Sequence, residues 1–208
     1  MLNAVIIGQL AVILKVYFDQ MGVNFDINDW PTSIELGVQI TFFMLVEDTT
    51  FFWSHKLLHH PAIYRHIHKQ HHEYKTTIGI ASEYCHPFEY VFSNIIPTAL
   101  GPQILGMRCH FFTLLMWFAL RTGETIDGHC GYDFSWSPYR LLPFSGGAQY
   151  HDYHHSHNVG NYSSFFTFWD TICGSNRHYF QFLAKKQEQE AMEAVKKQLD
   201  SEYVKKNN

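Results

Sequence analysis

Histidines at helical spacing dominate the chemistry available to this chain, which has 15 of them in 208 residues. Residues three or four positions apart share one face of a helix, and imidazole is the commonest metal ligand in proteins. The spacing therefore predicts a metal site. Eight histidines follow it: His55 and His59; His68, His71 and His72; His151, His154 and His155.

The number of these histidines predicts two metal ions, because one transition-metal ion takes roughly four to six protein ligands. A single histidine of this kind is ordinarily an exposed or hydrogen-bonded residue. Three clusters together are harder to explain in that way, since buried imidazoles without partners are costly. Ligand type alone leaves iron, zinc, copper and nickel open.

Apolar runs lie around the histidine clusters and predict the elements that position them. A helix needs about 20 apolar residues to cross a bilayer. On this basis we predict an all-α integral membrane protein with about four membrane segments and a His-rich helical domain. The runs are residues 2–18, 34–53, 89–107 and 111–120.

The charges around the first two clusters predict that the histidines face the cytosol. Lys56, Arg65, Lys69 and Lys75 lie there, and basic residues favour the cytosolic side of a membrane. A membrane hairpin at about 88–122 would return the chain to that side, so the third cluster could share the site. We expect membrane segments in 1–54, a catalytic domain in 55–178 that includes this hairpin, and a charged cytosolic tail in 179–208.

Composition gives no support for nucleic acid as a partner and agrees with a cytosolic location of the histidines. A net charge of −4 without a basic stripe gives no reason to expect nucleic acid binding. The four cysteines lack C-x-x-C spacing, which indicates free thiols and a site facing a reducing compartment. The final Lys205-Lys206 pair resembles a dilysine signal that returns membrane proteins to the endoplasmic reticulum.

With these motifs, the sequence resembles the fatty acid hydroxylase superfamily of membrane di-iron enzymes. The superfamily pattern H-x3-H, H-x2-HH and H-x2-HH is met at His55, His68 and His151. Within the superfamily the chain is most similar to the methylsterol monooxygenase branch. The stretches that carry this similarity are residues 67–73, 83–89, 124–133, 151–155 and 160–170.

The resemblance implies a di-iron enzyme of the endoplasmic reticulum membrane that uses O2 to oxidise the C-4 methyl group of sterol intermediates taken from the bilayer. No dinucleotide fingerprint, P-loop or haem attachment motif occurs in the chain. Electrons from NAD(P)H must therefore arrive through a separate donor, and the resemblance implies cytochrome b5 and its reductase.

The resemblance also implies roles for individual residues. The eight histidines would bind the two irons, with His129 as a ninth ligand. Four further residues are candidates near the centre: His86, whose following proline also fits a helix start, and the carboxylates of Glu83, Asp127 and Asp152, which could orient the ligand rings.

Three alternatives remain open at this stage. The first is another enzyme of the superfamily, such as a fatty acid or sphingolipid hydroxylase or a sterol desaturase. The second is a His-rich membrane protein that transports or binds metal, although transport would place histidines inside the apolar runs. The third is a zinc hydrolase.

Overall fold

The computed structural model describes residues 16, 18, 20, 22–106 and 108–207, and these form helices joined by loops. This part of the chain has no β-strand, only one isolated bridge between Asn24 and His110. The predicted all-α fold is confirmed for it. In order, the helices are α2 (Ser33–Leu58), α3 (Pro61–Tyr64), η1 (His68–Glu73), η2 (Gly79–Glu83), α4 (Pro87–Glu89), η3 (Tyr90–Ile95), α5 (Ile96–Ile104), α6 (Phe111–His129), η4 (Pro138–Leu141), α7 (Ala148–His157), α8 (Phe168–Cys173) and α9 (Arg177–Asn207).

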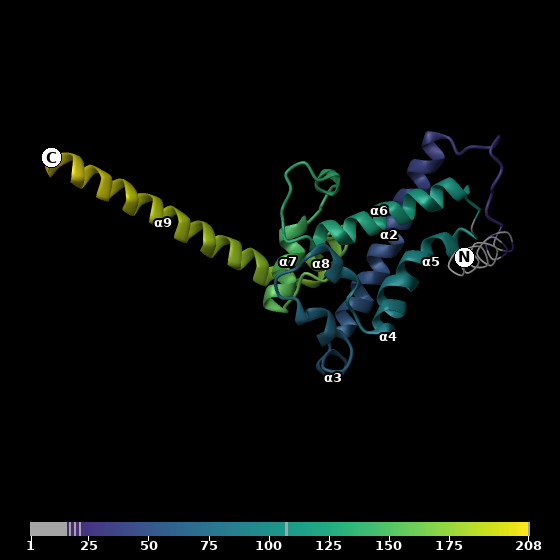
Figure 1. The fold of residues 1–208 in the computed structure, drawn as a ribbon, viewed down its shortest axis with the longest axis horizontal. Helices are drawn as coiled ribbons and strands as arrows, with labels where there is room; N and C mark the ends of the chain where they lie inside the picture. Colours follow the sequence, from purple (N-terminus) through teal and green to yellow (C-terminus); the bar gives the residue numbers. More distant parts are fainter. Residues whose placement is uncertain (1–15, 17, 19, 21, 107, 208) are drawn as a thin grey trace, which may run out of the picture.

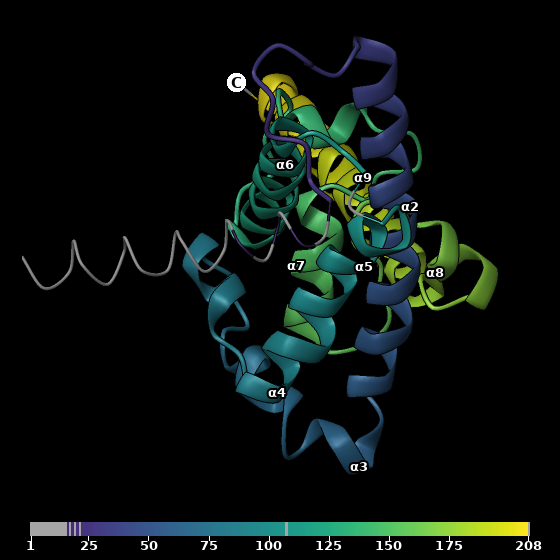
Figure 2. The same ribbon diagram turned by 90° about the vertical axis from the view of Figure 1, so that its right-hand side faces the viewer.

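Helix α2 runs the length of the body and carries the first histidines at its C-terminal end (Figure 2). It begins with a capping box, in which Thr32 Oγ1 accepts from the Glu35 amide and the Glu35 carboxylate accepts from the Thr32 amide. It ends at Leu58 with His59 as its C-cap, and Pro61 then favours a new helix start. The sequence thus fixes both ends of the helix that presents His55.

Helices α4, η3 and α5 form one continuous helical rod that packs on α2. The close approach requires a glycine, because a Cβ at Gly101 would lie 3.0 Å from the Phe43 Cα. The middle of the rod, η3, is π-helical. Such segments are rare in proteins, and those that do occur are often found at functional sites.

An apolar core lies between α2 and α6, at the end of the body away from the histidines. Phe43, Leu114 and Trp117 are almost completely buried in it. The Trp117 indole N–H donates to the Thr98 carbonyl at 2.9 Å, which ties α6 to α5. Because this core holds α2 and α6 together, the C-terminal ends of both helices are delivered to one place.

The predicted apolar runs compare as follows with the observed helices. The run at 34–53 lies in α2, and those at 89–107 and 111–120 correspond to the α4–α5 rod and to α6. The run at 2–18 lies almost wholly outside the described residues. Within the described part of the chain, no helix is at once long enough and apolar enough to cross a membrane.

Helix α9 projects away from the body as a long, isolated rod (Figure 1). Its residues from Phe182 onward are almost all exposed. The body therefore consists of α2 to α8 with the start of α9, and the histidines all lie within it.

Candidate metal centre

Four elements bring the histidines together. Helix α2 carries His55 in its last turn, and His59 is its C-cap residue. The second cluster lies on the short 3-10 helix η1, the third on α7, and His129 is the last residue of α6. Residues more than 90 positions apart thereby meet, as in the contact of 3.1 Å between the Nε2 atoms of His59 and His154.

The nine histidines form two groups, and within each group the ligand nitrogens all lie within 4.8 Å of one another. The five-His group consists of His55, His59, His68, His72 and His154, and the four-His group of His71, His129, His151 and His155. Seven of the nine are buried. The structure therefore gathers every histidine that the sequence and the resemblance proposed as a ligand.

Each H-x2-HH motif serves both groups. His72 belongs to the five-His group and its neighbour His71 to the four-His group; His154 and His155 divide in the same way. On a helix, consecutive residues diverge by about 100°. We expected His55 and His59 to face one way, and both lie in the five-His group. We also expected His68, His71 and His72 to face one way, and this is wrong: the adjacent His71 and His72 point to different groups and so join the two groups into one centre.

Backbone carbonyls fix the ring orientation of four ligands. In each of these rings the Nδ1–H group donates to a backbone carbonyl oxygen. The pairs are His55 to Tyr162 (2.9 Å), His71 to Tyr84 (3.3 Å), His129 to Thr125 (2.7 Å) and His154 to Gly160 (2.6 Å). A carbonyl only accepts, so Nδ1 must carry the proton in each ring. The Nε2 lone pair of each ring is then directed at the centre.

The close Nε2 contacts show that the donor set fits metal ions. The Nδ1–H groups of His71 and His129 both donate to carbonyls, so the Nε2 atoms of these rings carry lone pairs and no proton. These two Nε2 atoms nevertheless lie 3.3 Å apart. Two lone pairs cannot hydrogen-bond to each other. A metal ion between the rings would turn this unfavourable contact into two favourable ones, so the donor set fits metal ions.

Protonation is not an alternative source of that positive charge. Burial lowers the pKa of His55 and His129 to about 4, and that of His72 to about 3. Burial first, and neighbouring histidines second, also lower the pKa values of His71 and His154. Near neutral pH the rings are uncharged, which is the form that binds metals.

A buried carboxylate orients His68. The Nδ1–H of His68 donates to Glu89 Oε1 at 2.7 Å, and both side chains are almost inaccessible to solvent. Burial raises the pKa of Glu89 to about 8, and a positively charged metal ion at the centre would favour the ionised carboxylate. In that form Glu89 fixes the ring and raises the basicity of the ligand. Sequence reasoning missed this role of Glu89. The available signal was a carboxylate placed directly against an apolar run, where its charge needs a partner.

The four further candidates do not share the role predicted for them. His86 caps α4, its Nδ1 accepting from the Phe88 amide at 3.1 Å, which is the helix-start role. Asp127 accepts from Ser137 and Asp152 from Thr77. In the described residues none of the carboxylates of Glu83, Asp127 and Asp152 bonds to a ligand histidine, so the orienting role predicted for them falls to Glu89 and the carbonyls.

The loop after α7 supplies two of those carbonyls and is tightly constrained. A Cβ at Gly160 would overlap the Ser175 carbonyl oxygen, so a glycine is required there. The buried Asp170 carboxylate accepts from the amides of Tyr162 and Ser163 at 3.0 and 2.9 Å. Asp170 thus holds the loop that orients His55 and His154.

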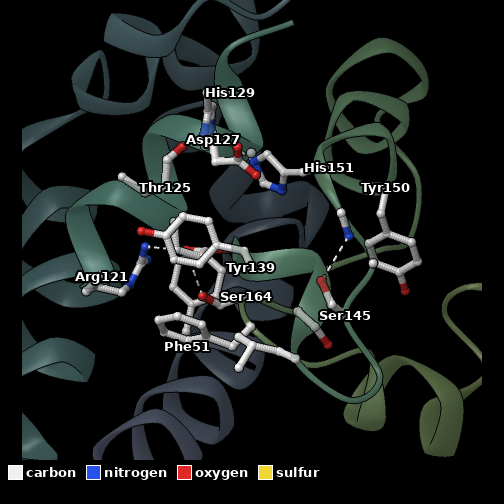
Figure 3. A pocket seen from close by; sticks show the side chains of 17 residues that line it. Phe51, Arg121, Thr125, Asp127, His129, Tyr139, Ser145, Tyr150, His151 and Ser164 are labelled. Atoms are coloured by element: carbon white, nitrogen blue, oxygen red, sulfur yellow. Dashed lines mark hydrogen bonds and ion pairs between the residues drawn. The ribbon is translucent and has the colours of Figure 1, made fainter. Parts of the chain in front are cut away.

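A buried ion network lies beside the four-His group. Arg121 donates to Glu47 at 2.6 Å and to Glu124 at 2.8 Å. Figure 3 shows Arg121 and Thr125 on α6 leading towards His129, around a pocket of about 40 Å³ that His151 also lines. The network joins α2 to α6 next to the four-His group.

A larger cavity of about 450 Å³ adjoins the histidines, bordered mainly by η3, α5 and α6. A small pocket of about 20 Å³ lies among five of the histidines. Ser82, Asn94 and Thr125 line both spaces. The cavity volume falls within the range of roughly 300–1,000 Å³ that is typical of sites for small organic ligands.

Comparison with known proteins identifies the relatives of this chain. Residues 40–175 match the family model described as Fatty acid hydroxylase. Methylsterol monooxygenase 2-2 of Arabidopsis thaliana is 42% identical over 167 residues, 78% of this chain and 60% of the relative. Methylsterol monooxygenase 2-1 of the same plant is 38% identical over 185 residues, 82% of this chain and 66% of the relative.

A relative with a different name is equally similar. A very-long-chain aldehyde decarbonylase of Oryza sativa subsp. indica is 45% identical over 144 residues, 68% of this chain and 53% of the relative. The chain thus spans between 53% and 66% of the length of these three relatives. No solved structure matches the chain.

Proposed function

The chain belongs to the fatty acid hydroxylase family, and we propose that it is a di-iron methylsterol monooxygenase that oxidises the C-4 methyl group of a sterol. The observation that carries this proposal is the pair of histidine groups, which offers two adjacent, nitrogen-rich metal sites. The named methylsterol monooxygenase relatives supply the substrate class.

The choice of iron follows from the chemistry. Hydroxylation converts R–CH3, O2, two electrons and two protons into R–CH2OH and H2O. Zinc has no redox chemistry in proteins, whereas imidazole ligands suit iron. Iron bound by the nine histidines would supply the oxygen-activating redox chemistry. Repeated hydroxylation would take the methyl group towards a carboxylic acid.

The protein residues would hold the reactants in place. The carbonyls and Glu89 keep the imidazole Nε2 atoms directed inward, so little reorganisation is needed when metal binds. The 450 Å³ cavity would hold the substrate body against the small pocket among the histidines. A filled cavity would keep bulk water away from the reacting carbon.

Electron supply and location complete the proposal. Since the chain has no nucleotide-binding motif, we propose that cytochrome b5 and its NAD(P)H-dependent reductase deliver the two electrons. We propose that the protein acts at the endoplasmic reticulum membrane with its centre on the cytosolic side. The basic residues near the first clusters support this location.

The relative named as an aldehyde decarbonylase favours a second candidate, in which the substrate is a very-long-chain aldehyde. Both candidates use the same histidines, so the site residues alone do not separate them. The substrate that the cavity accepts does separate them.

One assay tests the proposal. Microsomes that contain the full chain, NADH and a 4-methyl sterol are analysed by mass spectrometry for oxidised sterols, and the purified protein is analysed for metal. We expect 4-hydroxymethyl and 4-carboxyl sterols, with two irons per chain. Zinc without iron, together with no oxygen uptake, would refute it in favour of a hydrolase. Conversion of a very-long-chain aldehyde but of no sterol would establish the second candidate.

A further inference from the structure

We infer that Asn94 and Thr125 bind the hydroxyl group of the sterol substrate and thereby place its C-4 methyl group beside the histidines. This inference rests on the proposed function and deepens it by naming the residues that select a hydroxylated substrate. Asn94 comes from the π-helical segment η3, and Thr125 from the last turns of α6.

The two residues lie where the large cavity meets the centre. Both line the 450 Å³ cavity, and both line the small pocket among the histidines. Thr125 also borders the pocket of Figure 3, where it lies one turn from His129 on α6. A group bound by them would sit at the end of the cavity nearest the Nε2 atoms.

Both side chains have unused hydrogen-bonding capacity. Within the described chain, the Asn94 amide makes a single long contact of 3.9 Å to Cys85 Sγ, and the Thr125 hydroxyl has no partner. Thr49 and Thr50 behave differently, because their hydroxyls donate to carbonyls one turn earlier at 2.8 Å. An amide and a hydroxyl together can both donate to and accept from an alcohol.

The third shared residue, Ser82, is already engaged, since its hydroxyl donates to the Gly79 carbonyl at 2.8 Å. Two anchors hold the Asn94 segment in place. Ser93 shares a hydrogen bond of 2.9 Å with Ser54 of α2, and Glu89 binds His68. Asn94 is therefore presented from a fixed backbone rather than from a loop.

The chemistry of a 4-methyl sterol requires a polar group at this end of the cavity. A sterol carries its hydroxyl on C-3, the carbon next to C-4, so the hydroxyl oxygen and the reacting methyl carbon are close neighbours. A hydroxyl partner must then lie beside the metal centre. Further along the cavity, the lining includes Ile95, Leu114 and Phe118, which suits the apolar rings and side chain.

The test compares two substrates, a 4,4-dimethyl sterol and its 3-deoxy analogue, with the iron-loaded full chain. The readouts are kcat/KM in microsomes and Kd for the purified protein in micelles. We expect the unmodified protein to favour the hydroxylated sterol. Thr125→Val and Asn94→Leu should each cut this preference about ten-fold, the effect of about one buried hydrogen bond. Their kcat/KM for the deoxy sterol and their iron content should stay close to those of the unmodified protein.

Two further variants keep the test specific. Thr122→Val makes the same change one turn earlier on α6, at a residue that lines the cavity but not the histidine pocket. It should alter the rates for both sterols by the same factor. Thr125→Ser keeps the hydroxyl, so it should keep the preference even if Thr125→Val folds poorly.

The outcomes separate this inference from the proposed function. If the unmodified, iron-loaded protein neither binds nor oxidises either sterol, the proposed function fails and the inference fails with it. If it oxidises the sterol but Asn94→Leu and Thr125→Val leave the preference unchanged, only the inference fails. The same holds if Thr122→Val reduces the preference as strongly as Thr125→Val does.

Discussion

The two histidine groups differ in what orients their ligands. In the five-His group, His68 is held by the carboxylate of Glu89 at 2.7 Å. In the four-His group, His71 and His129 are held by neutral backbone carbonyls, those of Tyr84 and Thr125. A carboxylate partner makes a ligating imidazole more basic. The five-His group should therefore bind its metal more tightly, and the four-His group, with fewer ligands, should leave more coordination positions free.

The largest expected effect comes from removing one ligand of each group. His154→Ala and His71→Ala should both bring sterol turnover below detection, because the proposed reaction uses both ions. The iron content should fall further in His71→Ala, which leaves three histidines in its group, than in His154→Ala, which leaves four. Iron per chain from elemental analysis and sterol products from the microsomal assay measure this.

His157→Ala is the matched control, because it removes an exposed histidine from the same helix as His154. It should keep full turnover and both irons. Full activity in His154→Ala or His71→Ala would contradict the assignment of ligands.

Acid should destabilise the metal-free protein through both groups alike. The folded pKa values of His55 and His129 are about 4, against 6.5 as the ordinary value. As pH falls below 6.5, the unfolded chain takes up protons first. Stability is thus complete above about pH 6.5 and is lost towards pH 4, by about 1.4 kcal/mol per pH unit for each such histidine.

Urea unfolding of the metal-free protein between pH 7.5 and 4.5 measures this effect. Iron should protect the protein in that range, because the bound ligands cannot take up protons until metal is lost. A free energy of unfolding that does not change with pH would show that the histidines are not buried in neutral form.

Glu89→Gln should weaken only the five-His group. The amide keeps the shape but loses the negative charge, so the affinity for one of the two ions should fall about 10- to 100-fold. In a titration with a chelator, one ion should then be removed at a lower chelator concentration than in the unmodified protein. The other ion should be removed at the same concentration as in the unmodified protein. Equal loss of both ions, or of neither, would remove the difference between the groups.

The smallest effect is expected for Asp127→Asn, which serves as the control for Glu89→Gln. Asp127 accepts from Ser137, and in the described residues it makes no hydrogen bond to a ligand ring. Both ions should keep their affinity within about two-fold, since asparagine can still accept from Ser137 and the lost charge lies on a side chain that orients no ligand ring. A larger loss in the same chelator titration would return Asp127 to the orienting role predicted from sequence.

The sequence was sufficient to predict which histidines meet, but not how they divide. Spacing identifies candidate ligands such as His68 and His151, because chelation needs particular residue types at particular intervals. The division between neighbours such as His71 and His72 depends on the direction in which the whole helix faces, which tertiary contacts set. The carbonyl acceptors of Tyr162 and Gly160 carry no residue-type signal.

The helical class was also predictable, because the apolar runs have helical length and the ends of α2 have clear signals at Thr32 and Pro61. The part played by Glu89 was not. Its contact with His68 joins residues 21 positions apart through the turn at His86 and Pro87. Only the packed structure shows that this carboxylate reaches the centre.

The most direct test of the account is a diffraction measurement on iron-loaded crystals at the iron absorption edge. The account predicts two anomalous peaks per chain, one among His55, His59, His68, His72 and His154 and the other among His71, His129, His151 and His155. A single peak, or iron bound outside these histidines, would contradict it.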